Sequence, residues 1–584
     1  MKRIKHSVLF AAGLLLAPEL AHAQDTQNSD FRQPGAIITA PVDNPPTADN
    51  GAVAPPSPDL PYDSIPVPDR NRLIEVLGVH DNPLNPYTQS TLKGDRPIFG
   101  QDWFITLDML SDTLVQPQSL PTPSGAVSSS RPNENDAFGK PDQLIVNQTL
   151  LPSFTITKGD TTFMPPEFEF VFTPALNYNY VHVNEVGVLR ANPAKGTSRD
   201  DTFIGIQEAF IDYHLRNVSD RYDFDSLRVG IQPINVDFRG FLFQDDQLAA
   251  RLFGNRANNR FQYNLEFVQR IEKDTNSGLN DLSQDLRRDY IGIANLFVQD
   301  LPVHGMTTEF SVVHNWNRED GFYYDKNGFL IRPAQIGDER PHKYNVTYFG
   351  LNNDGHLGRL NLSSSFYYAI GNDSHNIFSQ EKANIAAYMG AIEPSIDFDW
   401  IRLRGSALYA SGDHDPYGKQ ETGFDAIQEN PQIAGADTSY WISQAIPLVG
   451  GGGVALSSRN GVLPSLRSSG DEGQSNFINP GLTLLGIGAD FDILPELRLT
   501  TNFNHLWFNN TEVLQVLRAQ ENIRHDIGWD LSSAITYRPF DTQNVVFRLT
   551  GAVLLPGEGF KDLYESEPNP RLYYSVLTNL VLKY

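Results

Sequence analysis

The sequence predicts an all-β transmembrane protein: an antiparallel β-barrel of about 16 strands, within a range of 14–18, preceded by a disordered N-terminal leader. Three observations predict it. The chain begins with an export signal, its segments from about residue 144 alternate polar and apolar residues with a period of two, and it ends inside such a segment. Each part of this prediction is taken in chain order below.

Residues 1–23 carry the parts of an export signal. Lys2, Arg3 and Lys5 are basic, residues 8–17 are apolar, and residues 21–23 (Ala-His-Ala) form a small-x-small cleavage site. No later segment approaches the roughly 20 apolar residues that a membrane helix needs. If the mature chain lies in a membrane, we therefore expect it to cross as a barrel.

Composition excludes several classes of function. The 584 residues include 45 Lys+Arg and 70 Asp+Glu, which gives a net charge of −25, and there is no cysteine. An acidic chain without a basic cluster is a poor partner for nucleic acid, so we expect none. Without cysteine the chain has no disulfide, no thiolate metal site and no covalently attached c-type haem.

The chain divides into four predicted parts. A signal peptide covers residues 1–23, and a Pro/Asp-rich disordered periplasmic leader covers 24–95, since such a composition buries too little apolar surface to offset its ordering entropy. Residues 96–143 form an irregular segment for which a plug and a first strand are both open. Residues 144–584 form the barrel.

Sixteen segments carry the strand pattern, and an even number suits a closed antiparallel barrel. They are 166–182, 203–215, 226–234, 259–270, 288–299, 306–316, 343–351, 357–370, 385–396, 399–411, 438–446, 482–493, 495–508, 524–538, 544–554 and 572–584.

Alternation alone does not orient the strands, because a soluble β-sandwich gives the same pattern with its apolar face inward. Two features favour apolar residues facing lipid and polar residues facing a wet lumen. Charges such as Arg402 and Arg404 lie in mid-strand, and aromatic residues such as Trp400 and Trp507 lie near strand ends, where an interfacial girdle would use them.

The last strand is the most specific local signal. Its alternating residues are Tyr574, Val576, Leu580, Leu582 and Tyr584. This ending resembles the terminal strand by which the barrel-assembly machinery recognises outer-membrane barrels, although Tyr stands where Phe is usual. The alternative is an edge strand of a secreted β-domain that ends in Tyr. The resemblance implies a protein of the Gram-negative outer membrane.

Longer stretches resemble a known group of barrels. Residues 479–530, beginning Asn479-Pro480-Gly481-Leu482, and residues 537–539 and 555–560 are similar to the C-terminal hairpins of alginate-export barrels. Residues 227–232 are similar to porin-like strands of the same broad group. The chain also resembles uncharacterised barrels associated with multihaem cytochrome systems. The acidic excess does not match a polyanion such as alginate as cargo.

Eight charged residues are candidates for the pore lining. Six lie close together in sequence: Arg239, Asp245, Asp246, Arg251, Arg256 and Arg260. If residues 241–253 fold inward, these six line the narrowest part of the pore, where facing acids and bases orient polar solutes; a salt-bridged outer loop or turn is the alternative. The alternation of their strand places Arg402 and Arg404 on the side that faces the lumen. The alternative is that they form ion pairs with a structural role.

These patterns favour a porin-like channel for passive diffusion of ions or small polar solutes. The alternative is a barrel that sheathes a separate multihaem cytochrome, with every haem in the partner. We expect no catalytic residues, no metal and no cofactor, because no nucleophile–base or metal-ligand pattern stands out. The expected partners are outer-membrane lipid and the barrel-assembly machinery. A periplasmic or multihaem cytochrome partner and a homo-oligomer remain open.

Overall fold

The computed structural model describes residues 90–100, 102–119, 142–159, 165–220, 223–436, 466–467, 469–540, 543–564 and 572–584, together with residues 78, 82, 85, 140, 438, 445–447 and 453–455. The predicted signal peptide (1–23) and residues 24–77 of the predicted leader lie outside the described residues.

Within the described residues, nineteen strands form one sheet. All of them except β16 make the wall of a barrel, which therefore has 18 strands. The wall strands are β1 (Trp103–Ser119), β2 (Asp142–Lys158), β3 (Phe168–Val183), β4 (Ser198–Asn217), β5 (Phe224–Asn235), β6 (Gln244–Arg256), β7 (Phe261–Gln269), β8 (Asp289–Gln299), β9 (Met306–Asn317), β12 (Tyr344–Leu357), β13 (Leu360–Asp373), β14 (Ala383–Phe398), β15 (Ile401–Ala410), β19 (Leu482–Leu494), β20 (Leu497–Trp507), β21 (Asp526–Tyr537), β22 (Val545–Pro556) and β23 (Tyr573–Lys583). Outside the wall lie β10 (Tyr323–Tyr324), β11 (Leu330–Arg332), β16 (Gln420–Glu421), β17 (Ala445–Pro447), β18 (Gly453–Ala455), the 3-10 turn η2 (Pro193–Lys195) and the short helices α2 (Glu512–Arg518) and α3 (Glu558–Tyr564).

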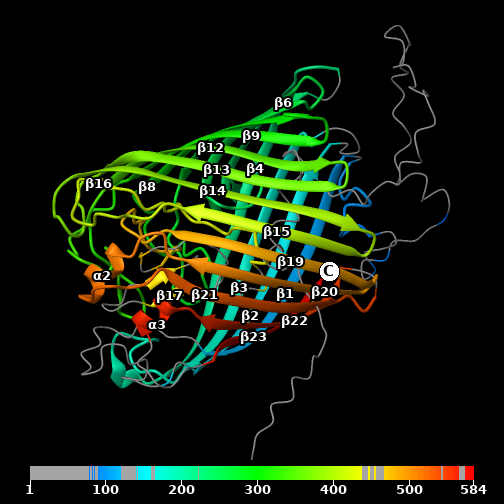
Figure 1. Cartoon of the computed structure of the whole chain (residues 1–584). Coiled ribbons are helices and arrows are strands. Elements are labelled where there is room, and N and C mark those ends of the chain that lie inside the picture. Colours follow the sequence, from blue (N-terminus) through cyan, green and yellow to red (C-terminus); the bar gives the residue numbers. More distant parts are fainter. Residues whose placement is uncertain are drawn as a thin grey trace, which may run out of the picture.

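The first and last strands close the barrel. β1 pairs with β23 in antiparallel register from Leu110 opposite Lys583 to Ser119 opposite Tyr574. Closure leaves no open sheet edge in the wall, which a bilayer requires because lipid cannot satisfy backbone hydrogen bonds. Both helices lie at the loop-rich end in Figure 1, and the C-terminus lies towards the opposite end.

The two ends of the barrel differ in their connections. Turns at 358–359, 399–400 and 495–496 lie at the end that holds the C-terminus, whereas the connections 270–288, 318–343 and 411–481 lie at the other. Short turns face the periplasm and long loops face outward in such barrels. The loop-rich end is therefore the extracellular end.

The outer surface of the wall is apolar. On β13 the side chains of Phe366, Tyr368 and Ile370 are 46%, 40% and 39% exposed, while the intervening Ser365 and Tyr367 are buried on the inner face. This arrangement confirms the predicted orientation and excludes the sandwich. A closed barrel with an apolar exterior also confirms the predicted outer-membrane location. Among the described residues, no helix combines the length and apolarity needed to cross a bilayer.

The wall has 18 strands, the upper limit of the predicted range of 14–18, rather than the 16 counted from the sequence. The sequence missed β1, β2 and β6 as strands and placed the start of the barrel at residue 144, whereas β1 begins at Trp103. β1 falls in segment 96–143, for which a first strand was one option. Polar residues in these strands obscure the alternation of polar and apolar positions. Gln148 on β2 bonds Ser111 and Thr113 of β1 on the outer face, which blurs the alternation, and β6 opens with four polar residues.

The predicted strand at 438–446 is not part of the wall. Of its residues, Ala445 and Ile446 pair with β18 in a separate two-stranded sheet. With β1, β2 and β6 added and this segment removed, the predicted strands become the 18 observed.

A short N-terminal segment, residues 90–95, completes the wall at the periplasmic end. Leu107 of β1 lies beyond the end of β23 and donates its N–H to the carbonyl of Leu92 (2.7 Å). Lys93 Nζ donates to Asp108 Oδ1 (2.8 Å) and lies 4.5 Å from the ring centroid of Tyr584. The segment thus pairs backbone groups that the shorter β23 leaves uncovered.

The hydrophobic core lies inside the barrel. It joins the connection between β5 and β6, residues 236–243, to parts of the connection between β15 and β19, and to inward side chains of the wall such as Tyr348 and Ala387. We call residues 236–243 the inward loop, and residues 424–436 and 469–479 the plug segments. The lumen therefore contains parts of the chain itself.

Candidate functional site

The inward loop is folded by one buried carboxylate. Asp237 accepts backbone N–H bonds from Arg239 (2.9 Å), Phe241 (3.1 Å) and Leu242 (3.1 Å), and the hydroxyl of Tyr367 on β13 donates to it (2.9 Å). Burial raises the pKa of Asp237, although these donors oppose the shift. The bonds close a compact turn and tie it to the opposite part of the wall.

Arg239 stands at the tip of this loop and reaches three groups. Its Nε donates to Ser363 Oγ (2.8 Å), its Nη2 donates to Glu393 Oε1 (3.1 Å), and its Nη1 donates to the carbonyl of Gln432 (2.9 Å). Ser363 lies on β13 and Glu393 on β14, so the inward loop crosses the lumen from β5 and β6 to β13 and β14. The Arg239 side chain is still 26% exposed, which leaves it within reach of a solute.

The first plug segment continues the crossing. The Ala434 N–H donates to Glu393 Oε2 (2.8 Å), and Asn504 Nδ2 on β20 donates to the Ala434 carbonyl (3.0 Å). Beyond it, Thr438 contacts Asn502 of β20 (2.6 Å) and Ser532 of β21 (3.0 Å). The inward loop and this segment together form a bar across the lumen, from β5–β6 to β20–β21.

A row of charges lines the inner face of five adjacent strands. Strand register places Glu169, Asp212, Arg228, Arg251 and Glu266 side by side from β3 to β7. Arg228 Nη2 lies 2.9 Å from Asp212 and 3.9 Å from Glu169, and Arg251 Nε lies 3.2 Å from Glu266. Acids thus flank the two arginines, and charges of both signs pair along one part of the inner wall.

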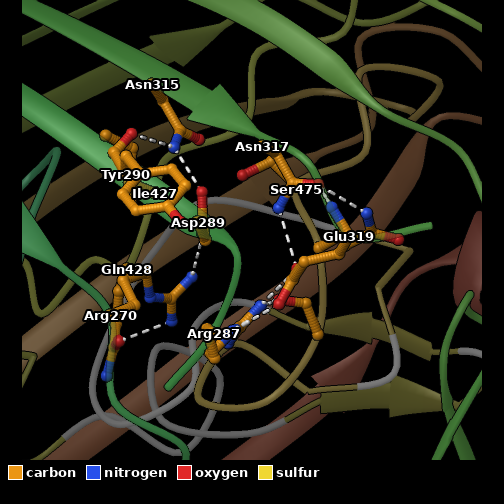
Figure 2. Close-up of polar contacts among 12 residues, drawn as sticks. Arg270, Arg287, Asp289, Tyr290, Asn315, Asn317, Glu319, Ile427, Gln428 and Ser475 are labelled. Atoms are coloured by element: carbon orange, nitrogen blue, oxygen red, sulfur yellow. Dashed lines mark hydrogen bonds and ion pairs between the residues drawn. The ribbon is translucent and has the colours of Figure 1, made fainter. Parts of the chain in front are cut away.

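Buried arginines hold both plug segments, and Figure 2 shows Arg287 beside Glu319 and Arg270 beside Asp289 and Gln428. Arg287 donates two hydrogen bonds to Glu319, from Nε (2.8 Å) and Nη2 (2.9 Å). It also donates to the carbonyls of Asp471 and Gly473 (both 3.0 Å). Arg270 donates to Asp289 (3.2 Å) and, from Nη2, to Gln428 (2.9 Å). The wall thus binds the backbone of the plug through charge-assisted hydrogen bonds.

Two further arginines complete these anchors. Arg332 binds Glu272 and donates to the Glu472 carbonyl (2.6 Å), and Arg467 binds Glu429 (2.5 Å) and the Ile427 carbonyl (3.0 Å). All four guanidinium groups are almost fully buried. These charge-assisted hydrogen bonds hold the plug segments in place.

Carboxyls in these loops have shifted pKa values. Although burial opposes ionisation, the positive charge of Arg287 and its hydrogen bonds lower the pKa of Glu319 to about 2. Burial raises the pKa of Glu472 to about 8, with Asp325 and Asp471 adding repulsion. Burial also raises the pKa of Asp413 to about 6. Among the described residues, no three His, Asp or Glu side chains are grouped to hold a metal ion.

The six clustered candidates occupy separate places rather than one constellation. Arg239 lies at the tip of the inward loop and Arg251 in the charged row, whereas Asp245 pairs with buried Lys273 (2.7 Å). Asp246 accepts a hydrogen bond from Gln207 (3.3 Å). The last two lie at the periplasmic end, where Arg256 pairs with Asp225 (2.7 Å) and Arg260 lies in the exposed turn before β7.

Arg402 and Arg404 lie on the inner face of β15. Arg404 donates to Asp490 (3.1 Å) and Asn502 (2.9 Å), and Arg402 pairs with Asp397 (2.5 Å). Both are ion-paired, which is what the alternative of a structural ion pair predicts. A role in the pore lining stays a prediction for all eight candidates.

Sequence reasoning missed most partners of these residues. Glu169, Asp212, Arg228 and Glu266 share the inward phase of their strands, so alternation could have found them once the strands were aligned. Glu393 and the four anchoring arginines had no such signal, since the partners described above lie 19 to 201 positions away in sequence.

The predicted assembly residues lie on the outer face of β23. Val576 and Leu582 are exposed, and Tyr574, Leu580 and Tyr584 share their phase. Tyr584 exchanges two backbone hydrogen bonds with Met109 of β1 (2.9 and 3.1 Å), which fixes the end of the seam. Recognition by the assembly machinery stays a prediction.

Comparison with known proteins gives likenesses of shape alone. No protein-family model matches the chain, and no curated protein matches it in sequence. Among solved structures, OccK7 (OpdD) of Pseudomonas aeruginosa is 9% identical with a TM-score of 0.45, covering 83% of this chain and 99% of that one. OccAB1 of Acinetobacter baumannii is 9% identical with a TM-score of 0.46 (82% and 96% covered). A BenF-like porin of Pseudomonas fluorescens Pf-5 is 9% identical with a TM-score of 0.43 (82% and 98%). TM-scores below 0.5 are too low for these likenesses to bear on the function of this chain.

Proposed function

We propose that the protein is a porin-like channel of the outer membrane that passes ions or small polar solutes through a narrowed, charged lumen. The observation that carries this proposal is the bar across the barrel with Arg239 at its centre, beside an inner wall lined by the row from Glu169 to Glu266. A passive filter needs charged groups in a restricted passage, and no chemical step.

A sheath around a cytochrome gains no support. A guest protein needs an empty bore, whereas the inward loop and the plug segments occupy part of this lumen. The same filling argues against a wide, unselective pore. We therefore propose a selective passage along the wall that the bar leaves uncovered.

The test is conductance of the full chain in planar bilayers. We expect stepwise conductance from the wild type. Arg239→Ala should raise the conductance and shift the reversal potential towards cations, because it removes a cation and the side chain that spans the gap. Arg340→Ala is the matched control, since Arg340 is 58% exposed in an outer loop and pairs with Asp338. Absence of stepwise conductance from correctly folded protein would overturn the proposal.

A further inference from the structure

Three cations form a row on the outer wall at the extracellular end. Arg288, Arg318 and Lys343 occupy the positions next to β8, β9 and β12 that point outward, because their chain neighbours on both sides are buried inside the barrel. Backbone pairing holds the row together: the Arg318 N–H donates to the Arg288 carbonyl (2.8 Å). We call these three residues the cation row.

The wall below the cation row is graded from polar to apolar. The next outward row holds Tyr290, Trp316 and Asn345, and the one below it holds Gly292, His314 and Thr347. Tyr290 stacks on Phe267 (ring centroids 6.2 Å apart), and Trp316 packs on His314 (4.2 Å). Lower still lie exposed apolar residues, among them Val312 (44%) and Phe349 (45%).

This order sets the depth of the cation row in the membrane. Aromatic side chains of a barrel lie at the level of the lipid headgroups, and the apolar band below them meets acyl chains. The cations stand two residues beyond Trp316 along their strands, which is about 7 Å at the rise of a β-strand. They therefore lie beside the headgroups of the outer leaflet.

The charge of the row is also unusual for this chain. Asp320 pairs with Arg288 (2.7 Å) and Lys343 (2.6 Å), and its pKa is lowered chiefly by the hydrogen bond from Lys343, so it stays ionised. Arg318 instead donates to the neutral Asn345 (2.6 Å). The patch keeps a net positive charge on a protein of net charge −25, and Arg288 remains 61% exposed.

We propose that the cation row binds the phosphate groups of an anionic glycolipid, lipid A, in the outer leaflet. Guanidinium groups match phosphate in geometry and charge, and the aromatic row beneath would contact the upper part of the acyl chains. The site fixes lipid around the barrel and offsets the repulsion between an acidic protein and an anionic leaflet. This inference rests on the orientation of the barrel and does not depend on channel activity.

The test is equilibrium binding of bisphosphorylated lipid A to the full chain in a non-ionic detergent. The triple variant R288Q/R318Q/K343Q should bind on the order of 100-fold more weakly than wild type, since each cation near an anionic surface contributes a several-fold factor. The triple variant K195Q/R340Q/K419Q removes the same charge from exposed outer positions and should bind like wild type.

Two ligand controls use the wild-type protein, so they do not depend on the folding of any variant. Lipid A without its phosphates should bind as weakly as bisphosphorylated lipid A binds the first variant, and inorganic phosphate should not displace the lipid. Equal binding of the dephosphorylated lipid, equal losses in both triple variants, or displacement by inorganic phosphate would overturn the proposal.

Discussion

The anchoring of the second plug segment depends most on Arg287. Its guanidinium is fully buried and makes four hydrogen bonds, two to Glu319 and two to plug carbonyls. Arg287→Met keeps an unbranched apolar chain in place of the aliphatic part of arginine and removes all four hydrogen bonds. Glu319 would then remain buried, with Arg332 Nε at 3.4 Å and Asn317 Nδ2 at 2.8 Å as its remaining support.

The size of the effect follows from this arrangement. Removing one partner of a buried ion pair costs about 3–5 kcal/mol, and the partners left to Glu319 favour the lower end of that range. A loss of about 3 kcal/mol in the free energy of local opening corresponds to about 150-fold more frequent opening. The barrel wall should keep its stability, because its strand pairing is untouched.

Hydrogen exchange measured by mass spectrometry reports this opening directly. Amides of residues 469–475 should lose about two orders of magnitude of protection in the variant, while amides of β13 and β14 should not change. Arg340→Met is the control, since its ion pair with Asp338 is exposed to solvent and contributes little to stability. Unchanged protection of the plug segment in Arg287→Met, with the wall intact, would refute the anchoring role.

Three further predictions test other parts of the structure. The pKa of Glu472 is the ordinary 4.5 when the plug segment is released and about 8 when the segment is closed, so closure binds a proton. Closure should therefore weaken as pH rises between these values. Glu472→Gln should remove this pH dependence from hydrogen-exchange rates that are corrected for their intrinsic pH effect. Gly230→Val should prevent pairing of β4 with β5, because φ of Gly230 is +134° and a Cβ there would lie 2.2 Å from the Ala209 carbonyl oxygen. The variant should therefore lose the heat-modifiable barrel band on gels. Gly551→Val is the control and should fold, because there is open space around Gly551. Tyr584→Ala should lower the amount of assembled barrel in cells several-fold. Lys583→Gln changes the opposite face of β23 and should leave the amount unchanged. Equal assembly of the two variants would count against a terminal recognition signal.

Alternation predicted most of the wall because the barrel turns one face of each strand to lipid. In residues 360–370 the outward residues are apolar except for Ser364, so the sequence contains both the strand and its orientation. β6 has no such pattern at its start, because Asp245 faces buried Lys273 and Asp246 meets Gln207, contacts made with other strands and loops. Local periodicity cannot report a contact that only the folded chain creates.

The same limit explains why the site was found only in part. Arg239 was a candidate because it lies among other charges, but its partners Ser363, Glu393 and Gln432 lie more than 120 positions further along the chain. The sequence also grouped Arg256 and Arg260 with Arg239, although the length of β6 places them at the periplasmic end. Proximity in sequence was therefore a poor guide to proximity in the lumen.

One sequence feature nevertheless carries information about the plug. A water-filled lumen favours polar residues at inward positions, yet Val346, Tyr348, Ala369, Ala387 and Met389 all point inward on three adjacent strands and are fully buried. Together with outward residues such as Phe349 and Tyr388, they make these strands apolar on both faces. A transmembrane strand with two apolar faces must be covered on the inside, since burial of such side chains is favourable by about 25 cal/mol per Å². Here residues such as Phe424 and Ile427 provide that cover. Apolar inward positions on β12 to β14 thus predict an internal plug against this part of the wall, and the arginines that bind the plug backbone then fix its position.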